Sequence, residues 1–498
     1  MQVNRVEGRR KIMAWFFLIL VFVILFLACV VLIRTFTVKS RQVRGLKADP
    51  IEINIDKAAL HLSEAVQIPT LSFSEDGAVD SLPFLKFRTL LEGQFPKVHA
   101  ALKKEIIAGD SLLYTWQGTD ANLKPVVLMA HIDVVPVLDE PGSPWTEPPF
   151  SGNIKDGFIW GRGTLDDKHS LMGILEAVEY LLEKGVVPHR TVLLAFGQDE
   201  EVGGLKGAAS IGAILGERGV HPEFILDEGG AIVKGLFGDL EIAALGIAEK
   251  GYVTIKLTME GKGGHSSQPP VHTTIGLLSE AVTRIEAHPH PVKLQGVIAS
   301  MLDYLGPELS LVNRMAMANL WLFNPLVTHF LESKPSTRAM MQTTQAVTII
   351  AGGTKDNILP PSASAAVNCR VIPGESVQQT VDYVRDMAGI PELKVEPETG
   401  FCVEPSPISP VDSPVFELLQ RSISQVFPNV IVAPYLVTGG TDTKHYSHLT
   451  NAVYRFSPAL MTTEDLRRVH GRDERISTQV YREMIHFYIQ LLLNSINK

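Results

Sequence analysis

The first feature of the hydrophobic pattern is an unbroken apolar run near the N-terminus. Residues 12–33, IMAWFFLILVFVILFLACVVLI, contain no charged side chain and are long enough to cross a bilayer as a helix. A cleaved signal peptide usually has a shorter apolar core and a small-residue cleavage site, and the following RTFTVKSRQVRG lacks such a site. The pattern therefore predicts a single uncleaved transmembrane helix.

Basic residues flank this run on both sides, so the positive-inside rule is nearly balanced. We expect residues 1–11 to form a cytoplasmic tail, residues 34–55 to form a stalk, and the body of the protein to be extracytoplasmic. The flanking residues are Arg5, Arg9, Arg10 and Lys11 before the run, and Arg34, Lys39, Arg41, Arg44 and Lys47 after it.

From residue 56 to 249, apolar strand-like runs alternate with helical patterns, which is typical of an α/β domain with a mixed, largely parallel sheet. Three runs end in acidic residues or histidine: PVVLMAHIDVVP, RTVLLAFGQDEE and EFILDEGG. Ligands of open α/β sheets bind outside the carboxyl ends of the strands. We therefore expect a functional site at that edge of the sheet.

The pattern changes at residue 250, where YVTIKLTM alternates apolar and polar residues as a half-exposed antiparallel strand does. Glycine-rich EGKGGHSSQPP follows, then a predicted helix and further strands. We predict that residues 250–371 form a smaller α+β unit inserted into the first domain. The α/β pattern resumes over 372–498, which we assign to the second part of the larger domain.

Composition narrows the possible functions. A net charge of −9 and a pI near 5.9 argue against a nucleic-acid partner. Three cysteines are too few for a disulfide framework, and only Cys369 and Cys402 could pair, which the sequence does not decide. Because no cysteine spacing suits zinc, a metal ion would need histidine and carboxylate ligands.

The stretch WGRGTLDDKHSLMG places Asp166 beside Asp167 just before an apolar helical pattern. An aspartate at this point is a favoured helix cap, and capping accounts for one carboxylate. It does not account for two adjacent ones, whose repulsion a cation would relieve. Taken alone, the stretch favours capping over a metal site.

Together with the strand ends, the set of acids and histidines indicates metal chemistry. Oxygen and imidazole ligands suit zinc, and also manganese or cobalt. A pair of metal ions needs a bridging carboxylate, which Asp166 can provide, and such a pair activates water and polarises a carbonyl. The set comprises His131, Asp133, Asp166, Glu200, Glu201, Asp227 and His470.

Six segments in this order resemble the motifs of the aminoacylase-1/carboxypeptidase family of di-zinc metallopeptidases: MAHIDVVP, WGRGTLDDK, QDEEVGG, DEGG, GGHSSQPP and RRVHGRDERIS. The resemblance implies a zinc-peptidase catalytic domain with an inserted lid or dimerisation domain. It implies two zinc ions, one held by His131 and Asp227 and the other by Glu201 and His470, with Asp166 bridging both.

The resemblance also assigns roles around the metals. Asp133 would orient His131, and Glu200 would be the general base. From its glycine-rich context alone His265 could be a turn residue, whereas the resemblance implies that it stabilises the oxyanion, often from across a homodimer. Asn357, Arg370, Gly439 and Gly440 would contact the substrate carboxylate, although arginines on exposed strand faces are common. The family further predicts a cis peptide bond between Asp166 and Asp167.

The reaction implied is hydrolysis of an amide bond in a peptide or N-acyl amino acid, with condensation as its reverse. The alternatives are a two-metal phosphoesterase and a non-catalytic metal- or peptide-binding membrane protein. Residues 310–345 carry more apolar bulk than a small lid needs. They form either the core of the inserted unit or a groove for a long acyl chain.

Overall fold

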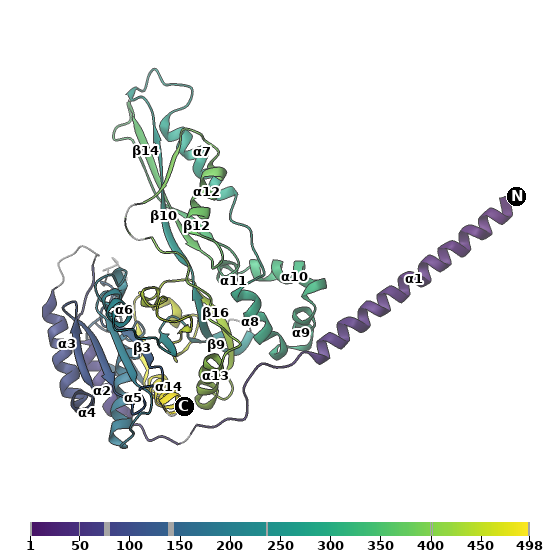
Figure 1. Cartoon of the computed structure of the whole chain (residues 1–498). Helices are drawn as coiled ribbons and strands as arrows, with labels where there is room; N and C mark the ends of the chain where they lie inside the picture. The colour runs from purple at the N-terminus through teal and green to yellow at the C-terminus, as the bar shows by residue number, and fades with distance from the viewer. Residues whose placement is uncertain are drawn as a thin grey trace.

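The computed structural model describes residues 2–48, 50–73, 80–137, 144–235, 238–398, 400 and 402–496. The described part excludes most detail of the expected cytoplasmic tail, namely Met1 and the side chains of residues 2–11. It also excludes residues 497–498. Figure 1 shows a larger body with a mixed sheet, a smaller sheet extending from it, and the long helix α1 (Gln2–Thr37) projecting to one side.

The larger domain is built on a ten-stranded mixed sheet whose order is β1-β2-β6-β3-β7-β17-β9-β8-β18, with β16 paired to β9. Strands β6, β3, β7 and β17 are parallel neighbours. The predicted α/β fold is therefore confirmed. The ten strands are β1 (Lys103–Ile107), β2 (Ser111–Trp116), β3 (Val126–His131), β6 (Val192–Gly197), β7 (Phe224–Asp227), β8 (Ile232–Gly235), β9 (Gly238–Glu249), β16 (Ile431–Val437), β17 (Val453–Arg455) and β18 (Leu460–Met461).

Helices cover both faces of this sheet, as the buried strands require. Along β3, Val126, Leu128 and Ala130 pack into the larger core, while Val127 and Met129 pack into a second one. This alternation follows from the two-residue period of a strand. The surrounding helices are α2 (Ile55–Val66), α3 (Ser81–Gln94), α4 (Pro96–Ala101), α5 (Lys168–Glu183), α6 (Ala208–Glu217), α13 (Pro414–Val426) and α14 (Thr478–Ile496).

The smaller domain is an antiparallel sheet in the order β12-β14-β10-β15. Strand β10 (Gly251–Glu260) continues the direction of β9 after a single residue, so one long ribbon joins the two domains. Apolar side chains of α7 (Thr274–Ala287) and α12 (Val377–Ala388) pack on this sheet in a core of their own. The other strands are β12 (Thr344–Gly352), β14 (Ser362–Val371) and β15 (Lys394–Pro397).

The predicted boundaries of the inserted unit, 250 and 371, differ from the structure in two ways. Helix α12 and strand β15 follow residue 371 yet belong to the smaller domain, because β15 pairs with β10. The helices of residues 297–339 instead bury their apolar side chains in the core of the larger domain. These helices are α8 (Val297–Leu305), α9 (Leu311–Ala318), α10 (Leu320–Glu332) and α11 (Pro335–Ala339).

The segment expected to be a stalk lies along the body. After α1 ends at Thr37, the Gln42 side chain forms two hydrogen bonds of 2.9 Å with the backbone of Val432 in β16. Gln420 of α13 donates to the backbone oxygen of Arg41 at 2.9 Å. Polar side chains therefore hold this segment on the larger domain, a pattern that hydrophobic periodicity does not reveal.

Helix α1 contains a stretch, Ile12–Thr37, that is long and apolar enough to cross a membrane. Its side chains from Ile12 to Phe26 are exposed, as those of a lipid-facing helix would be. Cys369 and Cys402, the possible pair, are both free thiols.

Candidate metal centre and active-site cavity

His131 ends β3 at the carboxyl edge of the sheet, and Asp133 holds it there. The ring Nδ1 lies 3.3 Å from Asp133 Oδ1. The fully buried Asp133 carboxylate also accepts hydrogen bonds of 3.1 Å from the backbone N–H groups of Glu200 and Glu201. One aspartate thereby fixes the end of β3 against the turn that follows β6.

Asp166 lies between two histidines. Its Oδ1 is 2.9 Å from His131 Nε2, and its Oδ2 is 2.9 Å from His470 Nε2. His470 Nε2 is also 3.1 Å from Glu201 Oε2. Two candidate metal-binding groups therefore share Asp166, which is the geometry required of a bridging carboxylate.

The capping interpretation of the paired aspartates does not fit this geometry. Asp166 points toward the histidines, and Asp167, which precedes α5, makes no side-chain capping hydrogen bond. The peptide bond between the two is cis, as the resemblance predicted.

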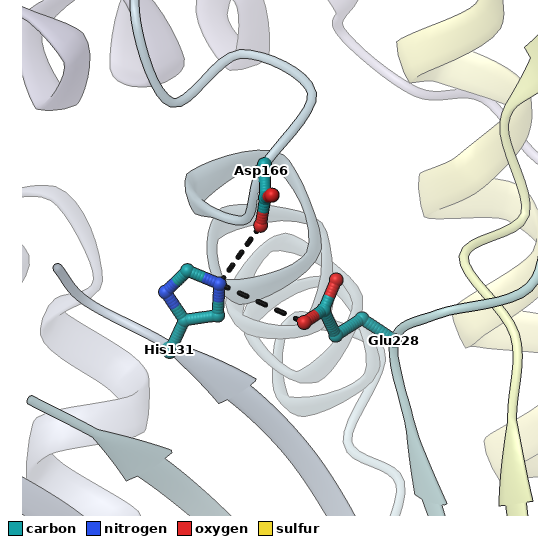
Figure 2. A group of neighbouring side chains, drawn as sticks. All are labelled: His131, Asp166 and Glu228. Carbon is teal, nitrogen blue, oxygen red and sulfur yellow. Dashed lines mark hydrogen bonds and ion pairs between the residues drawn. The ribbon is translucent and has the colours of Figure 1, made fainter. Parts of the chain in front are cut away.

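At the end of β7, the structure brings Glu228, the neighbour of the predicted ligand Asp227, into the first group. The first group consists of His131, Asp166 and Glu228, whose Oε1 lies 3.8 Å from His131 Nε2. Figure 2 shows Asp166 and Glu228 directed at the same ring nitrogen. Asp227 belongs to neither candidate group, and its role as a ligand stays a prediction. The DEGG motif contains both acids, and its spacing alone did not distinguish them.

A buried ion pair that the sequence analysis missed supports the Asp166 loop. Glu474 pairs with Arg162, and both are buried. Its Oε1 accepts hydrogen bonds from the backbone N–H groups of Gly163 at 2.9 Å and Leu165 at 2.7 Å. Arg162 also donates to the backbone oxygen of His470 at 3.1 Å. The pair therefore links the loop carrying Asp166 to the loop carrying His470.

The charges at the site are closely packed. Burial raises the pKa values of Glu200, Glu201 and Glu228 above the ordinary range for glutamate. Burial would also raise the pKa of Asp166, but hydrogen bonds from His131 and His470 outweigh it and hold that pKa below its usual value. So many neighbouring carboxylates favour a cation between them.

The donor atoms fit divalent metal ions. Among the described residues of the two groups, Glu201 has one oxygen, Oε1, that is buried without any hydrogen-bond partner. Buried polar atoms are nearly always paired, so such an atom indicates a ligand at this point. The set of carboxylate oxygens and imidazole nitrogens, without thiolates, suits zinc, cobalt or manganese.

The second candidate metal-binding group consists of Asp166, Glu201 and His470. A cavity of about 850 Å³ opens beside it. Its lining includes Glu200, Glu201 and His470, together with the cationic side chains Lys250 and Arg370. The Arg370 guanidinium lies 4.6 Å from the centre of the Tyr252 ring. Gly439 and Gly440 also contribute to the wall.

The remaining predicted residues lie elsewhere. His265 and Asn357 do not line the cavity; both are exposed on the smaller domain, where β11 (Gly264–His265) pairs with β13 (Ile358–Leu359). None of residues 310–345 lines this cavity, so an acyl groove formed by them stays a prediction.

The comparisons with known proteins agree with this fold and site. The pattern of Peptidase family M20/M25/M40 matches residues 127–494, and the chain belongs to this family. Its members include carboxypeptidases and N-acyl-amino-acid hydrolases, so the chain is an enzyme of the metallopeptidase class. The family predicted from the six motifs is confirmed.

Three relatives are similar over most of their length. The chain is 43% identical to a probable carboxypeptidase S-like 2 of Dictyostelium discoideum, covering 92% of this chain and 90% of the relative. It is 40% identical to the N-fatty-acyl-amino acid synthase/hydrolase PM20D1 of Xenopus tropicalis, covering 94% and 93%. It is 34% identical to carboxypeptidase S of Saccharomyces cerevisiae, covering 87% and 83%.

Solved structures share the fold at lower identity. The M20 metallo-carboxypeptidase Sso-CP2 of Sulfolobus solfataricus superposes with a TM-score of 0.63 at 18% identity, covering 87% of this chain and 98% of that one. The YXEP protein of Bacillus subtilis, described as a dinuclear metal-binding M20 peptidase, superposes with a TM-score of 0.54 at 13% identity, covering 89% and 98%.

Proposed function

We propose that this protein hydrolyses the amide bond of peptides and N-acyl amino acids, releasing an amino acid with a free carboxylate. The observation that carries the proposal is that one cavity is lined by Glu200, by Glu201 and His470 of the second metal group, and by Arg370. Metal-binding and acidic groups can activate the amide bond that is cleaved. A guanidinium can bind the free carboxylate of the substrate.

Two metal ions would occupy the two groups that share Asp166. His131, Asp166 and Glu228 would hold one, and Asp166, Glu201 and His470 the other. We propose zinc, with cobalt or manganese as substitutes. When bound, the pair would polarise the amide carbonyl and increase the acidity of a water molecule.

Glu200 is the proposed general base. It lines the cavity next to Glu201, and Asp133 fixes its backbone N–H through a 3.1 Å hydrogen bond. Its carboxylate would take a proton from the attacking water and deliver it to the leaving nitrogen. Glu200 can do this because it is not one of the proposed metal ligands. Arg370 and the backbone of Gly439 and Gly440 would hold the substrate carboxylate.

His265 would stabilise the oxyanion only if a second copy brings it to the cavity. In one chain, His265 and Asn357 are exposed on the β11–β13 pair and line no part of the site. The exposed edge strand β12 offers a surface for pairing. We therefore propose a homodimer in which His265 of the partner subunit completes the site.

We also propose that α1 anchors the protein as a single-pass membrane protein with its body extracytoplasmic. Protease protection of sealed membrane vesicles would test this orientation. The relative from Xenopus tropicalis is named as a synthase and a hydrolase, and we propose that the same site can condense fatty acid and amine when both are in excess.

The function is tested with full-length protein that is stripped of metal, reloaded with Zn²⁺, Co²⁺ or Mn²⁺, and assayed on dipeptides and N-acyl amino acids. We expect activity to return with metal and to fall when the substrate carboxylate is amidated. Hydrolysis of phosphate esters instead would indicate the phosphoesterase alternative. Tight binding of peptides without turnover by the reloaded protein would indicate a binding protein.

A further inference from the structure

Outside the catalytic site, the most unusual surface is an apolar one on α9 and α10. Six large apolar side chains are exposed there, with Val312 at 70% and Leu326 at 62% of full exposure. Residues 315–331 contain no Asp, Glu, Lys or Arg. We call this set the apolar face; it consists of Leu311, Val312, Trp321, Leu322, Leu326 and Phe330.

The face is a regular feature of α10. Val327 and Leu331 are buried against the larger domain, whereas Leu322, Leu326 and Phe330 are exposed at four-residue spacing. The helix is therefore apolar on both sides, although only one side packs on protein. An apolar face of this size on a soluble surface indicates a binding partner.

The position of the face identifies that partner. Asn319, buried between α9 and α10, donates from Nδ2 to Val31 O at 3.2 Å and lies 3.3 Å from Thr35 Oγ1, both in α1. Val31 and Thr35 belong to the apolar stretch Ile12–Thr37 that can cross a membrane. Figure 1 shows α9 and α10 beside the end of α1 that joins the body. These two helices thus lie level with the last turns of the span.

From the depth of this contact and the chemistry of the face, we infer that α9 and α10 lie in the headgroup region of the bilayer that α1 crosses. Val31 precedes Thr37 by six residues, a rise of about 9 Å along a helix, and interfacial helices sink about 5–10 Å. Helix α10, at 13 residues, is too short to span a bilayer. Trp321 is the aromatic type enriched at that depth.

This membrane contact would fix the orientation of the enzyme as well as its location. The stalk is bound to the body by Gln42 and Gln420, and Arg44 pairs with Glu308 next to α8. The body is therefore attached to the end of α1 at several points. The inference rests on the proposed anchoring by α1, and its test separates the two.

The experiment uses the full-length chain in phosphatidylcholine vesicles, with a fluorescent NBD group on a single introduced cysteine. Cys29→Ala and Cys402→Ser remove the exposed native thiols. The probe is placed at Leu326 by Leu326→Cys, and at Leu82 of α3 by Leu82→Cys as a matched exposed control. We expect a lipid-borne doxyl quencher to reduce emission severalfold more at Leu326 than at Leu82.

A second variant tests the face itself. With the probe at Val312, the change Leu322→Glu/Leu326→Glu should lower quenching to the level of the Leu82 probe. The matched pair Leu60→Glu/Leu85→Glu, equally exposed on α2 and α3, should leave it unchanged. Because all four side chains are exposed, folding should persist.

Resistance to alkaline carbonate extraction reports on α1 independently. A protein that resists extraction but shows no quenching at Leu326 overturns the membrane contact and leaves the anchor intact. Extractable protein that is still quenched at Leu326 overturns the anchor, and with it the inferred placement beside a membrane-spanning α1, even though the apolar face meets lipid. Blue-shifted emission that the quencher does not reduce indicates cover by a second protein copy and overturns the inference.

Discussion

Asp166 Oδ2 lies 2.9 Å from His470 Nε2, although the two residues come from opposite parts of the chain. The other oxygen of the same carboxylate faces His131 at the same distance. One side chain therefore joins the end of β3 to the loop before β19 (Arg475–Ser477). Replacing Asp166 would disturb both metal groups. Variants that test one group at a time must therefore change a residue that belongs to that group alone.

The pair Asp227 and Glu228 makes the first metal group testable. We expect Glu228→Gln to lower the bound metal from about two ions per chain to about one, because an amide oxygen is a weaker ligand than a carboxylate. Asp227→Asn should retain about two. Native mass spectrometry of the metal-loaded protein measures both. Loss of an ion from Asp227→Asn alone would return the ligand role to Asp227.

Glu200→Gln keeps the shape of the side chain and removes its ability to accept a proton. We expect turnover to fall by a factor on the order of 10²–10⁴ while the metal content stays unchanged. Glu183→Gln, an exposed acid at the end of α5, is the matched control and should be fully active. Near-normal turnover of Glu200→Gln would place the base elsewhere.

The Arg162–Glu474 pair predicts a large effect on stability. Glu474→Ala leaves the Arg162 charge buried and removes the acceptor of Gly163 and Leu165, and breaking a buried pair costs about 3–5 kcal/mol. Glu464→Ala breaks the exposed pair with Arg468 and should cost about 0–1 kcal/mol. Chemical denaturation measures both. Equal effects of the two variants would contradict the positioning role of Glu474.

The larger part of the fold could be predicted from the sequence because its strands are fully buried and read as continuous apolar runs. The strand ends at His131, Glu200 and Glu201 also predicted where the site lies. His470 is different, since a histidine in a charged, exposed loop carries no local signal. Only the family motif singled it out, and the structure brings it to Asp166.

The errors of the sequence analysis have physical causes. The apolar segment 310–345 was assigned to a lid core or an acyl groove because hydrophobic spacing does not say which partner a helix meets. Strand β15 was assigned to the wrong domain, since the pairing of Lys394–Pro397 with β10 depends on long-range hydrogen bonds. Arg162 and Glu474 were missed because they pair with each other and with backbone groups far away in the sequence.

Lys250, between β9 and β10, predicts a dependence of stability on pH. Burial lowers its pKa to about 7 from an ordinary value of 10.5. Between these values the unfolded chain holds a proton that the folded chain has lost, so this residue makes the protein more stable as pH rises from about 7 to 10.5. Below about pH 7, where the folded protein must carry a buried charge, its contribution is least favourable.

The comparison of the wild-type chain with Lys250→Met isolates this effect, because other titrating groups cancel. We expect the variant to be more stable relative to wild type at pH 6.5 than at pH 9, as measured by urea unfolding at both values. A difference between the two proteins that does not change with pH would show that Lys250 titrates normally.

Arg370 makes the substrate specificity testable. It lies on β14, lines the same cavity as Glu201 and His470, and stacks on Tyr252, so its guanidinium is held in place. If it binds the substrate carboxylate, Arg370→Gln should lower kcat/KM on N-acyl amino acids, because a bidentate charge-assisted contact contributes about 1.5–3 kcal/mol. The corresponding decrease is on the order of 10–100-fold.

The activity of the same Arg370→Gln variant should change little on substrates whose carboxylate is amidated, since these never form the contact. Arg467→Gln, at the end of a short 3₁₀ helix outside the cavity lining, controls for the loss of one positive charge. An equal loss of activity on free and amidated substrates would mean that Arg370 shapes the cavity without recognising the carboxylate.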